Sequence, residues 1–345
     1  MLVRAHWQTG SVPERDLLVL SEDPFNAETK LDEKTPAITP PGRHYVRTHF
    51  SIPAGPRAIV VEGASVPAIS FDEIRALPIR SMVVTLECAG NGRRFLDPKA
   101  PGEQWGLGAV GTATWTGTSL RDVLGKVEIP PGTVELLFRG ADRGVPKDLG
   151  RQISYERSLS IDEALRDDVL VAYLMEGHSI PREHGGPLRL IVPGWYGMAS
   201  VKWLERITLL DAPFTGFFQK DRYVIDGLAL RAIEPRAVIA WPVDGADVIG
   251  TLEVRGFAWS GRAAVDRVEL SVDGRSHHAS LAPPADAARF AWREFFVRPA
   301  LEPGEHLLVA RAIDRDGNEQ PLSAPWNPLG YANNAVRPTR IRVRG

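Results

Sequence analysis

The sequence predicts two strand-rich domains, the second of which is an antiparallel sandwich of immunoglobulin type. The chain has 345 residues, more than one hydrophobic core usually holds. Its 28 prolines and 32 glycines interrupt short β-branched runs, a texture typical of many short strands and irregular loops. Near residues 233–236 these runs change to regular apolar–polar alternation. We therefore expect domains at residues 1–232 and 233–345.

Helix signals are few and lie in the first domain. Residues 119–124 read as one short helix beginning at a serine. Residues 160–165 read as another, because Ser160 is followed three residues later by Glu163, as in a capping box. Both helices are expected to be short.

The strand signals of the second domain are clearer. Apolar and polar residues alternate over residues 252–259 and 265–272, and Asp273-Gly274 then supplies a hairpin turn. Residues 306–314, followed by the turn sequence 315–318, repeat this scheme. Several such strands over about 110 residues predict the sandwich.

Composition excludes several classes of protein. A formal net charge of −2 argues against a general nucleic-acid partner, which needs a dense basic surface. The single cysteine excludes an intrachain disulfide framework and zinc sites built from paired cysteines. No stretch approaches the 18 apolar residues of a membrane span, and residues 1–7 resemble no leader. We expect a cytoplasmic chain, or a periplasmic one if a leader has been removed.

The single cysteine, Cys88, ends a short apolar run and is followed by Ala-Gly-Asn-Gly and two arginines, Arg93 and Arg94. Glycines allow a bound group to approach the backbone, and nearby guanidinium charge favours the thiolate. Cys88 is therefore a candidate metal ligand or nucleophile. The alternative is a buried cysteine that acts only as a small hydrophobe.

Four further segments each contain a cation or a polar aromatic side chain, and three of them also contain glycine or proline. Arg189 and Lys202 suit an anion such as phosphate, one through a planar fork and the other as a point charge. Each residue also has an ordinary structural explanation, such as a charge at a strand end or a buried histidine. Walker and Gly-x-Ser-x-Gly motifs are missing from the sequence. The four segments are residues 44–53, 105–117, 184–197 and 200–204.

Taken in order, these segments resemble the sulfite oxidase family of molybdenum-cofactor oxidoreductases, in its bacterial haem-free form. The resemblance covers residues 40–340. Its most specific motifs are Leu86–Asn91, Trp115–Leu124, Ala172–Gly177, His184–Arg189, Val201–Trp203 and Trp326–Gly330.

The resemblance implies a mixed α+β cofactor-binding domain, followed by an immunoglobulin-like domain that mediates homodimerisation. It implies that Cys88 binds molybdenum, whose other sulfur ligands come from the dithiolene of a pyranopterin (molybdopterin). A soft thiolate suits such a metal. The implied cofactor contacts are Tyr45, Val46, Arg47, Thr48, His49, Asp142, His184, Arg189, Ser200, Val201 and Lys202.

The resemblance also implies the reaction, which is oxidation of sulfite to sulfate by oxygen-atom transfer. The implied catalytic residues are Arg47, Arg93, Trp105 and Tyr223, of which Tyr223 stands 21 residues after Lys202. Arginines would neutralise the sulfur oxyanion, and a phenol could donate to developing oxygen charge. We expect no haem in this chain, so electrons would pass to a separate acceptor such as a cytochrome c. Nucleic-acid and membrane partners are not expected.

Departures from the family pattern keep other hypotheses open. Leu329 stands where animal and plant sulfite oxidases have an arginine that helps to bind sulfite, and Thr48 replaces a common asparagine. The substrate could therefore be another sulfur compound, such as a sulfane or a sulfoxide. A metal-free binding or scaffold module, and a cysteine hydrolase using Cys88, are the remaining alternatives.

Overall fold

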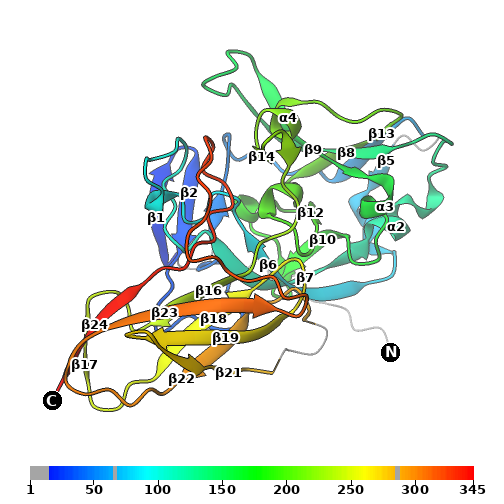
Figure 1. Ribbon diagram of the computed structural model, residues 1–345. Coiled ribbons are helices and arrows are strands. Elements are labelled where there is room, and N and C mark those ends of the chain that lie inside the picture. The colour runs from blue at the N-terminus through cyan, green and yellow to red at the C-terminus, as the bar shows by residue number, and fades with distance from the viewer. Residues whose placement is uncertain (1–14, 65–67, 284–287) are drawn as a thin grey trace, which may run out of the picture.

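The computed structural model describes residues 15–64, 68–283 and 288–345. Figure 1 shows the C-terminal part, coloured yellow to red, as a pair of sheets lying against the blue-to-green N-terminal part. Most regular structure is strand, and each α-helix has only four or five residues. Within the described ranges no helix is both long and apolar enough to cross a bilayer. Residues 1–7, on which the expectation about a leader rests, lie outside those ranges.

Three sheets and a small hairpin make up the N-terminal part. The first sheet is antiparallel, with β1 (Leu17–Glu22), β2 (Phe25–Thr29) and β3 (Val46–Arg47) in that order. The second has the order β11 (His178–Ser179), β10 (Leu170–Met175), β7 (Val110–Ser119), β6 (Arg80–Glu87), with β12 (Arg189–Ile191) also paired to β10. The third has the order β5 (Ala68–Ser70), β4 (Ala58–Glu62), β13 (Leu204–Leu210), β8 (Glu135–Gly144), β9 (Ile153–Ser160). The hairpin pairs β14 (Val224–Ile225) with β15 (Leu228–Ala229).

Short helices connect these strands. The α-helices are α1 (Phe71–Arg75), α2 (Leu120–Val123), α3 (Ile161–Ala164) and α4 (Phe217–Lys220). The 3₁₀ turns are η1 (Arg93–Phe95), η2 (Leu124–Lys126), η3 (Arg182–His184) and η4 (Gly197–Ala199). Both helices predicted from the sequence are confirmed: the Ser119 side chain caps α2, and Ser160 and Glu163 form the capping box of α3.

The C-terminal part consists of two sheets. One has the order β16 (Arg236–Trp241), β18 (Val254–Trp259), β22 (Arg293–Val297), β21 (Ser280–Leu281). The other has the order β17 (Ala246–Ile249), β24 (Thr339–Arg344), β23 (Gly304–Asp314), β19 (Val265–Val272), β20 (Arg275–His278). The predicted hairpin is confirmed, because Asp273 and Gly274 both have positive φ and join β19 to β20.

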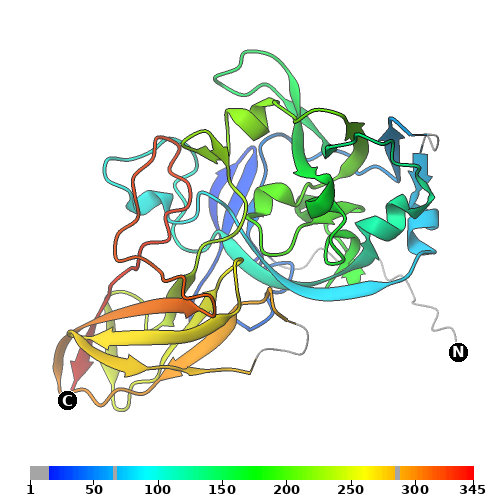
Figure 2. The same ribbon diagram turned by 45° about the vertical axis from the view of Figure 1, so that its right-hand side comes forward.

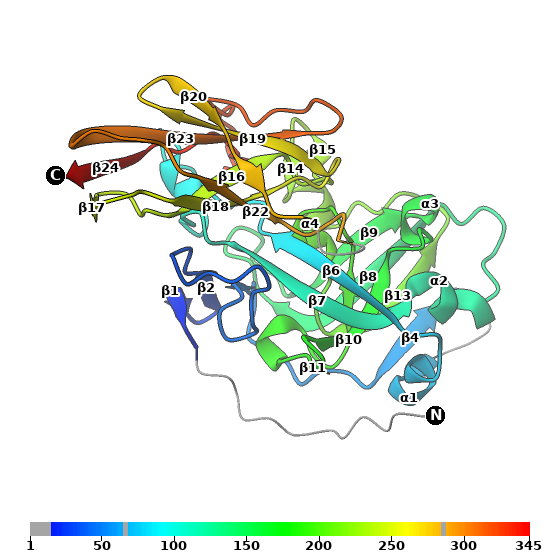
Figure 3. The same cartoon turned by 90° about the horizontal axis from the view of Figure 1, so that it is seen from below.

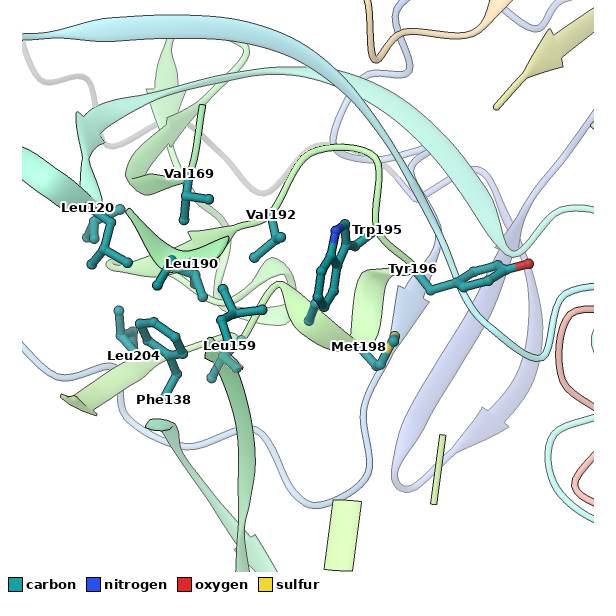
Figure 4. Close-up of a cluster of buried hydrophobic side chains, with 14 of the residues drawn as sticks. Leu120, Phe138, Leu159, Val169, Leu190, Val192, Trp195, Tyr196, Met198 and Leu204 are labelled. Atoms are coloured by element: carbon teal, nitrogen blue, oxygen red, sulfur yellow. The ribbon is translucent and has the colours of Figure 1, made fainter. Parts of the chain in front are cut away.

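The main hydrophobic core contains residues from both parts of the chain. It contains Leu120, Val169 and Leu190 of the N-terminal part, shown in Figure 4. It also contains Phe257 and Trp259 of β18. A separate cluster fills the space between the two C-terminal sheets. The two parts therefore share buried apolar surface.

Two features bring the C-terminal part to the end of β6. The antiparallel pair β6–β7 extends toward β22 (Figure 3), and Val84 forms a bridge with Phe290. The segment between β23 and β24, coloured red, rises beside the N-terminal part in two views (Figures 1 and 2). Cys88 follows β6 directly, so it lies where the two parts meet.

Candidate functional site

Most of the predicted site residues line one pocket of about 670 Å³, a volume that includes its open mouth. They come from segments that are far apart in the sequence: β3, the end of β6, β8, and the loops around η3 and η4. The predicted residues among them are Tyr45, Val46, Arg47, Thr48, His49, Cys88, Asp142, His184, Arg189, Ser200, Lys202 and Tyr223.

Cys88 lies at the pocket wall as a free, buried thiol. Its backbone N–H donates to the carbonyl of Ala109, 2.8 Å away, and its carbonyl accepts from the N–H of Asn91 at 2.9 Å. Burial raises the pKa of the Cys88 thiol, while the guanidinium groups of Arg47 and Arg93 oppose that rise. The two guanidinium groups thus offset part of the effect of burial and would stabilise negative charge on the Cys88 sulfur.

Arg47 and Thr48 are fixed by a side chain of the first sheet. The Asn26 Oδ1 accepts from Arg47 Nη1 at 3.1 Å and from the Thr48 N–H at 2.8 Å. Thr48 Oγ1 donates to the carbonyl of Phe25. The Thr48 hydroxyl is thus used to fix the strand, and the guanidinium of Arg47 remains part of the pocket wall.

Arg47, His49 and Tyr223 form a connected row. Arg47 Nη2 lies 3.1 Å from His49 Nδ1, and His49 Nε2 lies 2.6 Å from the Tyr223 hydroxyl. Burial, with the Arg47 charge, lowers the pKa of His49 well below its usual value, so the ring is neutral near pH 7. Burial raises the pKa of Tyr223 well above 10, so its phenol stays protonated. The row can thus present a guanidinium and a neutral phenol to an anion.

The backbone conformation of Tyr223 is unusual, and its ring packs against a second tyrosine. Its backbone φ of 57° is in the left-handed region, where bulky side chains are rare. The ring of Tyr331, from the segment between β23 and β24, stacks on it with a centroid separation of 5.2 Å. Arg93 lies over the other aromatic ring of this pair, 5.2 Å from the centroid of Tyr331. The C-terminal part therefore supports the phenol.

Two buried basic residues form the deeper wall. Arg189 donates to the carbonyls of His184 and Ser200, and Lys202 Nζ donates to the carbonyl of Glu183 at 2.9 Å. Neither forms an ion pair with a carboxylate of the described ranges. Burial lowers the pKa of Arg189 to about 10, and burial with the Arg189 charge lowers the pKa of Lys202 well below its usual value. A bound anion would raise both pKa values and stabilise the charged form of each group.

Several buried polar atoms of this wall lack a protein partner. They include Asp142 Oδ1 and Arg189 Nε. Burial raises the pKa of Asp142 to about 6, with Lys202 opposing the rise. Buried polar groups are normally hydrogen-bonded, so these free atoms indicate where a polar ligand can bind.

The side chains of His184 and Ser200 are held by hydrogen bonds, and the backbone at Gly197 is closely packed. His184 Nε2 lies 3.0 Å from the carbonyl of Pro41, and the Ser200 hydroxyl accepts from the N–H of Val192. A Cβ at Gly197 would lie 2.6 Å from the Tyr45 hydroxyl, so a larger residue there would displace the Tyr45 side chain. The pocket shape is therefore set by close packing on this side.

Three predicted residues lie outside the pocket lining. Val201 is fully buried in the main core. Trp105 is fully buried in a smaller cluster that also contains Cys88, and its indole nitrogen has no partner. Arg93 donates to the carbonyls of Glu103 and Leu329. Their roles in catalysis or cofactor binding remain predictions.

The sequence did not identify some residues of the site. Tyr155 and Glu183 line the pocket, and Tyr331 supports Tyr223. His44 also lines it, although only its segment had been noted. A signal existed only for His44, which stands beside the predicted cofactor contacts.

Comparison with known proteins gives a consistent result. Residues 58–218 match the family model "Oxidoreductase molybdopterin binding domain", and residues 232–344 match "Mo-co oxidoreductase dimerisation domain". The chain is 34% identical to sulfite oxidase of Gallus gallus, over 92% of this chain and 76% of that protein. It is 32% identical to mitochondrial sulfite oxidase of Drosophila melanogaster, over 96% of this chain, and spans 64% of that protein's length.

A solved structure extends the comparison to the fold. The sulfane dehydrogenase SoxCD of Paracoccus pantotrophus superposes with a TM-score of 0.79 at 25% identity, covering 98% of this chain and 92% of that one. With the sequence matches, this similarity covers both parts of the chain. The chain belongs to the sulfite oxidase family of molybdenum-cofactor oxidoreductases.

Proposed function

We propose that this protein is a molybdenum enzyme that oxidises sulfite. In the balanced reaction, sulfite and water give sulfate, two protons and two electrons, which leave to an acceptor outside this chain. The observation that supports it most directly is the arrangement of the pocket, in which Cys88, the row Arg47–His49–Tyr223, and the pair Arg189 and Lys202 surround one space. When bound, the molybdenum–pyranopterin group supplies the oxygen-atom transfer and accepts the electron pair.

The residues present fit this cofactor. Cys88 provides a thiolate, the donor type that sulfur-coordinated transition metals prefer. Arg189 and Lys202, which have no carboxylate partner in the described ranges, would bind the phosphate of the pterin. The unpartnered Asp142 Oδ1 would accept from a pterin N–H. We assign Tyr45, Thr48, His184 and Ser200 to the same cofactor pocket.

The remaining pocket residues would bind the substrate. The guanidinium of Arg47 would neutralise the sulfite dianion, and the Tyr223 hydroxyl would donate to an oxygen of sulfite or of the developing sulfate. His49 would orient that hydroxyl through its Nε2. Arg93 adds positive charge from behind Tyr331, and Trp105 excludes water from the side of Cys88.

Leu329 supports a second candidate substrate. Leu329 is partly buried, and its carbonyl accepts from Arg93 Nε at 3.2 Å, so no side-chain cation enters the site at this position. A related sulfur compound, such as a sulfane or a sulfoxide, would suit a pocket with less positive charge. The similarity to a sulfane dehydrogenase favours this candidate.

Replacing Leu329 by arginine separates the two candidates. If free sulfite is the substrate, Leu329→Arg should lower the KM for sulfite by about 10-fold, because a hydrogen bond to a charged group contributes about 1.5–3 kcal/mol. Steady-state kinetics with a soluble electron acceptor measure this value. A Leu329→Met variant is the control for side-chain size. An unchanged or raised KM with arginine would favour the other sulfur compound.

Replacing Lys202 by methionine tests the cofactor assignment. Lys202→Met should lower the bound pterin and molybdenum per chain, because the phosphate loses one buried charged donor, an affinity change of about 10-fold or more. Elemental analysis and pterin fluorescence after extensive dialysis measure the loss. Lys220→Met, on the exposed end of α4, should retain the cofactor fully. Equal retention in both variants would contradict the assignment.

The second domain supports a further part of the proposal. We assign residues 1–232 to the catalytic domain and residues 233–345 to an immunoglobulin-like domain that forms a homodimer. Two packed sheets with their own core, and the matched dimerisation model, support this assignment. A small cytochrome is the kind of acceptor we propose for the electrons. Sedimentation analysis of the purified chain tests the dimer directly.

A further inference from the structure

We propose that the C-terminal domain positions the Cys88 turn through the buried ion pair of Arg236 and Glu87. Arg236 does not line the pocket, so it is a positioning residue. Its importance for turnover rests on the proposed ligand role of Cys88. The positioning itself depends only on contacts between the two domains.

The contacts begin along β6, before the cysteine. The N–H of Thr85 donates to the carbonyl of Phe290 at 2.8 Å. In return, the Thr85 hydroxyl accepts from the N–H of Trp292 at 2.7 Å. A segment of the C-terminal domain thus holds Thr85 of β6 by one main-chain hydrogen bond and one bond to its side chain, and Cys88 is three residues further along.

Glu87, the residue before Cys88, is held more strongly. The side chains of Glu87 and Arg236 are 1% and 2% exposed, and Arg236 Nε lies 3.0 Å from Glu87 Oε1 as an ion pair. The indole N–H of Trp259 donates to Glu87 Oε2 at 2.8 Å, and Asn91 Nδ2 donates to Glu87 Oε1 at 2.9 Å. Removing one partner of such a buried pair leaves an uncompensated charge, so the loss of Arg236 should strongly disturb Glu87.

The turn after Cys88 is held from the same side. The N–H of Ala332 donates to the carbonyl of Ala89 at 2.8 Å, and Asn333 Nδ2 donates to the carbonyl of Gly92 at 2.8 Å. Arg236 Nη2 reaches the carbonyls of both Asn91 and Asn333, at 3.3 and 2.5 Å. Arg236 therefore links Glu87, the turn and the segment between β23 and β24.

These contacts explain how the thiol is directed. Successive residues of an extended chain point to opposite sides. Glu87 does not line the pocket and its carboxylate is bound by the C-terminal domain, while its neighbour Cys88 does line it. Fixing Glu87 consequently fixes the direction of the Cys88 side chain.

The single cysteine makes a direct test possible. In the cofactor-free chain, Cys88 is the only thiol, and thiols react with iodoacetamide much faster than other side chains do. Arg236→Leu should raise the rate of Cys88 alkylation by about tenfold or more, because the turn opens locally more often. The matched control is Arg262→Leu, which removes an exposed pair with Glu234 and no contact to the turn. Its alkylation rate should be unchanged.

A urea series separates positioning from general loss of stability. If the turn opens locally, the faster alkylation of Arg236→Leu persists at low urea with little dependence on urea concentration. Alkylation that tracks global unfolding at every urea concentration, or a rate equal to that of the unmodified chain, would overturn the proposal. Trp259→Phe, which removes one hydrogen bond to Glu87 and keeps an aromatic ring, should give a smaller rise of about threefold. It serves as the test variant if Arg236→Leu does not fold.

The same variants distinguish this proposal from the proposed function. Alkylation is measured without cofactor, so a faster rate supports positioning even if the loaded enzyme proves inactive on sulfite. With cofactor, Arg236→Leu should change the electron paramagnetic resonance signal of the reduced metal, whereas Arg262→Leu should not. An identical signal in the two variants would show that the turn does not depend on Arg236.

Discussion

The Cys88→Ser variant is expected to lose nearly all turnover while remaining folded and retaining the pterin. Residues that only orient a metal ligand contribute about 10- to 100-fold, so loss of the ligand itself should leave less than about 1% of the rate. The proposed pterin contacts lie on other segments and should persist. Steady-state kinetics, circular dichroism and pterin fluorescence of the same preparation measure the three outcomes.

The substitution is a close match in size, because serine differs from cysteine by one atom. Unfolding alone would therefore not explain a loss of turnover, provided that the circular dichroism spectrum is unchanged. Retained turnover would contradict the ligand role and would show that Cys88 acts only as a small buried hydrophobic side chain. X-ray absorption at the molybdenum edge should show one sulfur neighbour fewer in the variant.

Replacing Arg47 by methionine should have the second largest effect. Its guanidinium is held by Asn26 and His49 and forms one end of the row that ends at Tyr223. Loss of a charged donor from an anion site should lower kcat/KM for sulfite by about 10- to 100-fold. Because positive charge beside the thiol would also be lost, kcat and KM should both change.

Arg182→Met provides the matched control for Arg47→Met. Arg182 is exposed on η3, close in the chain to His184, and its side chain does not line the pocket. This variant should keep kcat/KM within about twofold of the unmodified chain. A loss of similar size in both variants would show that general electrostatic attraction, and not contact with the substrate, explains the effect of Arg47.

Local features of the fold could be predicted from the sequence because their causes are local. The caps of α2 and α3 depend on residues within one turn, and the β19–β20 hairpin depends on Asp273 and Gly274. Strand β19 has the predicted bounds, residues 265–272. Strand β18 begins at residue 254, two residues later than its alternating pattern, and ends where predicted.

The candidate site was predictable only where its residues stand in recognisable motifs. Cys88, Arg189 and Lys202 were found in this way, and the structure brings them to one pocket. Tyr331 was not found, because its contact with Tyr223 joins positions 108 residues apart and no local pattern marks it. The role of Asn26 was missed for the same reason: a single asparagine just after a turn predicts nothing about a partner in β3.

The burial of Arg189 and Lys202 affects how stable the chain is before it binds the cofactor. Without an anion between them, Arg189 and Lys202 oppose each other's charge, and burial opposes both. A ligand that binds only the folded chain stabilises it in proportion to its affinity and supply. A cell that synthesises this polypeptide faster than it synthesises the pterin would accumulate a less stable form, which chaperones retain and proteases remove first.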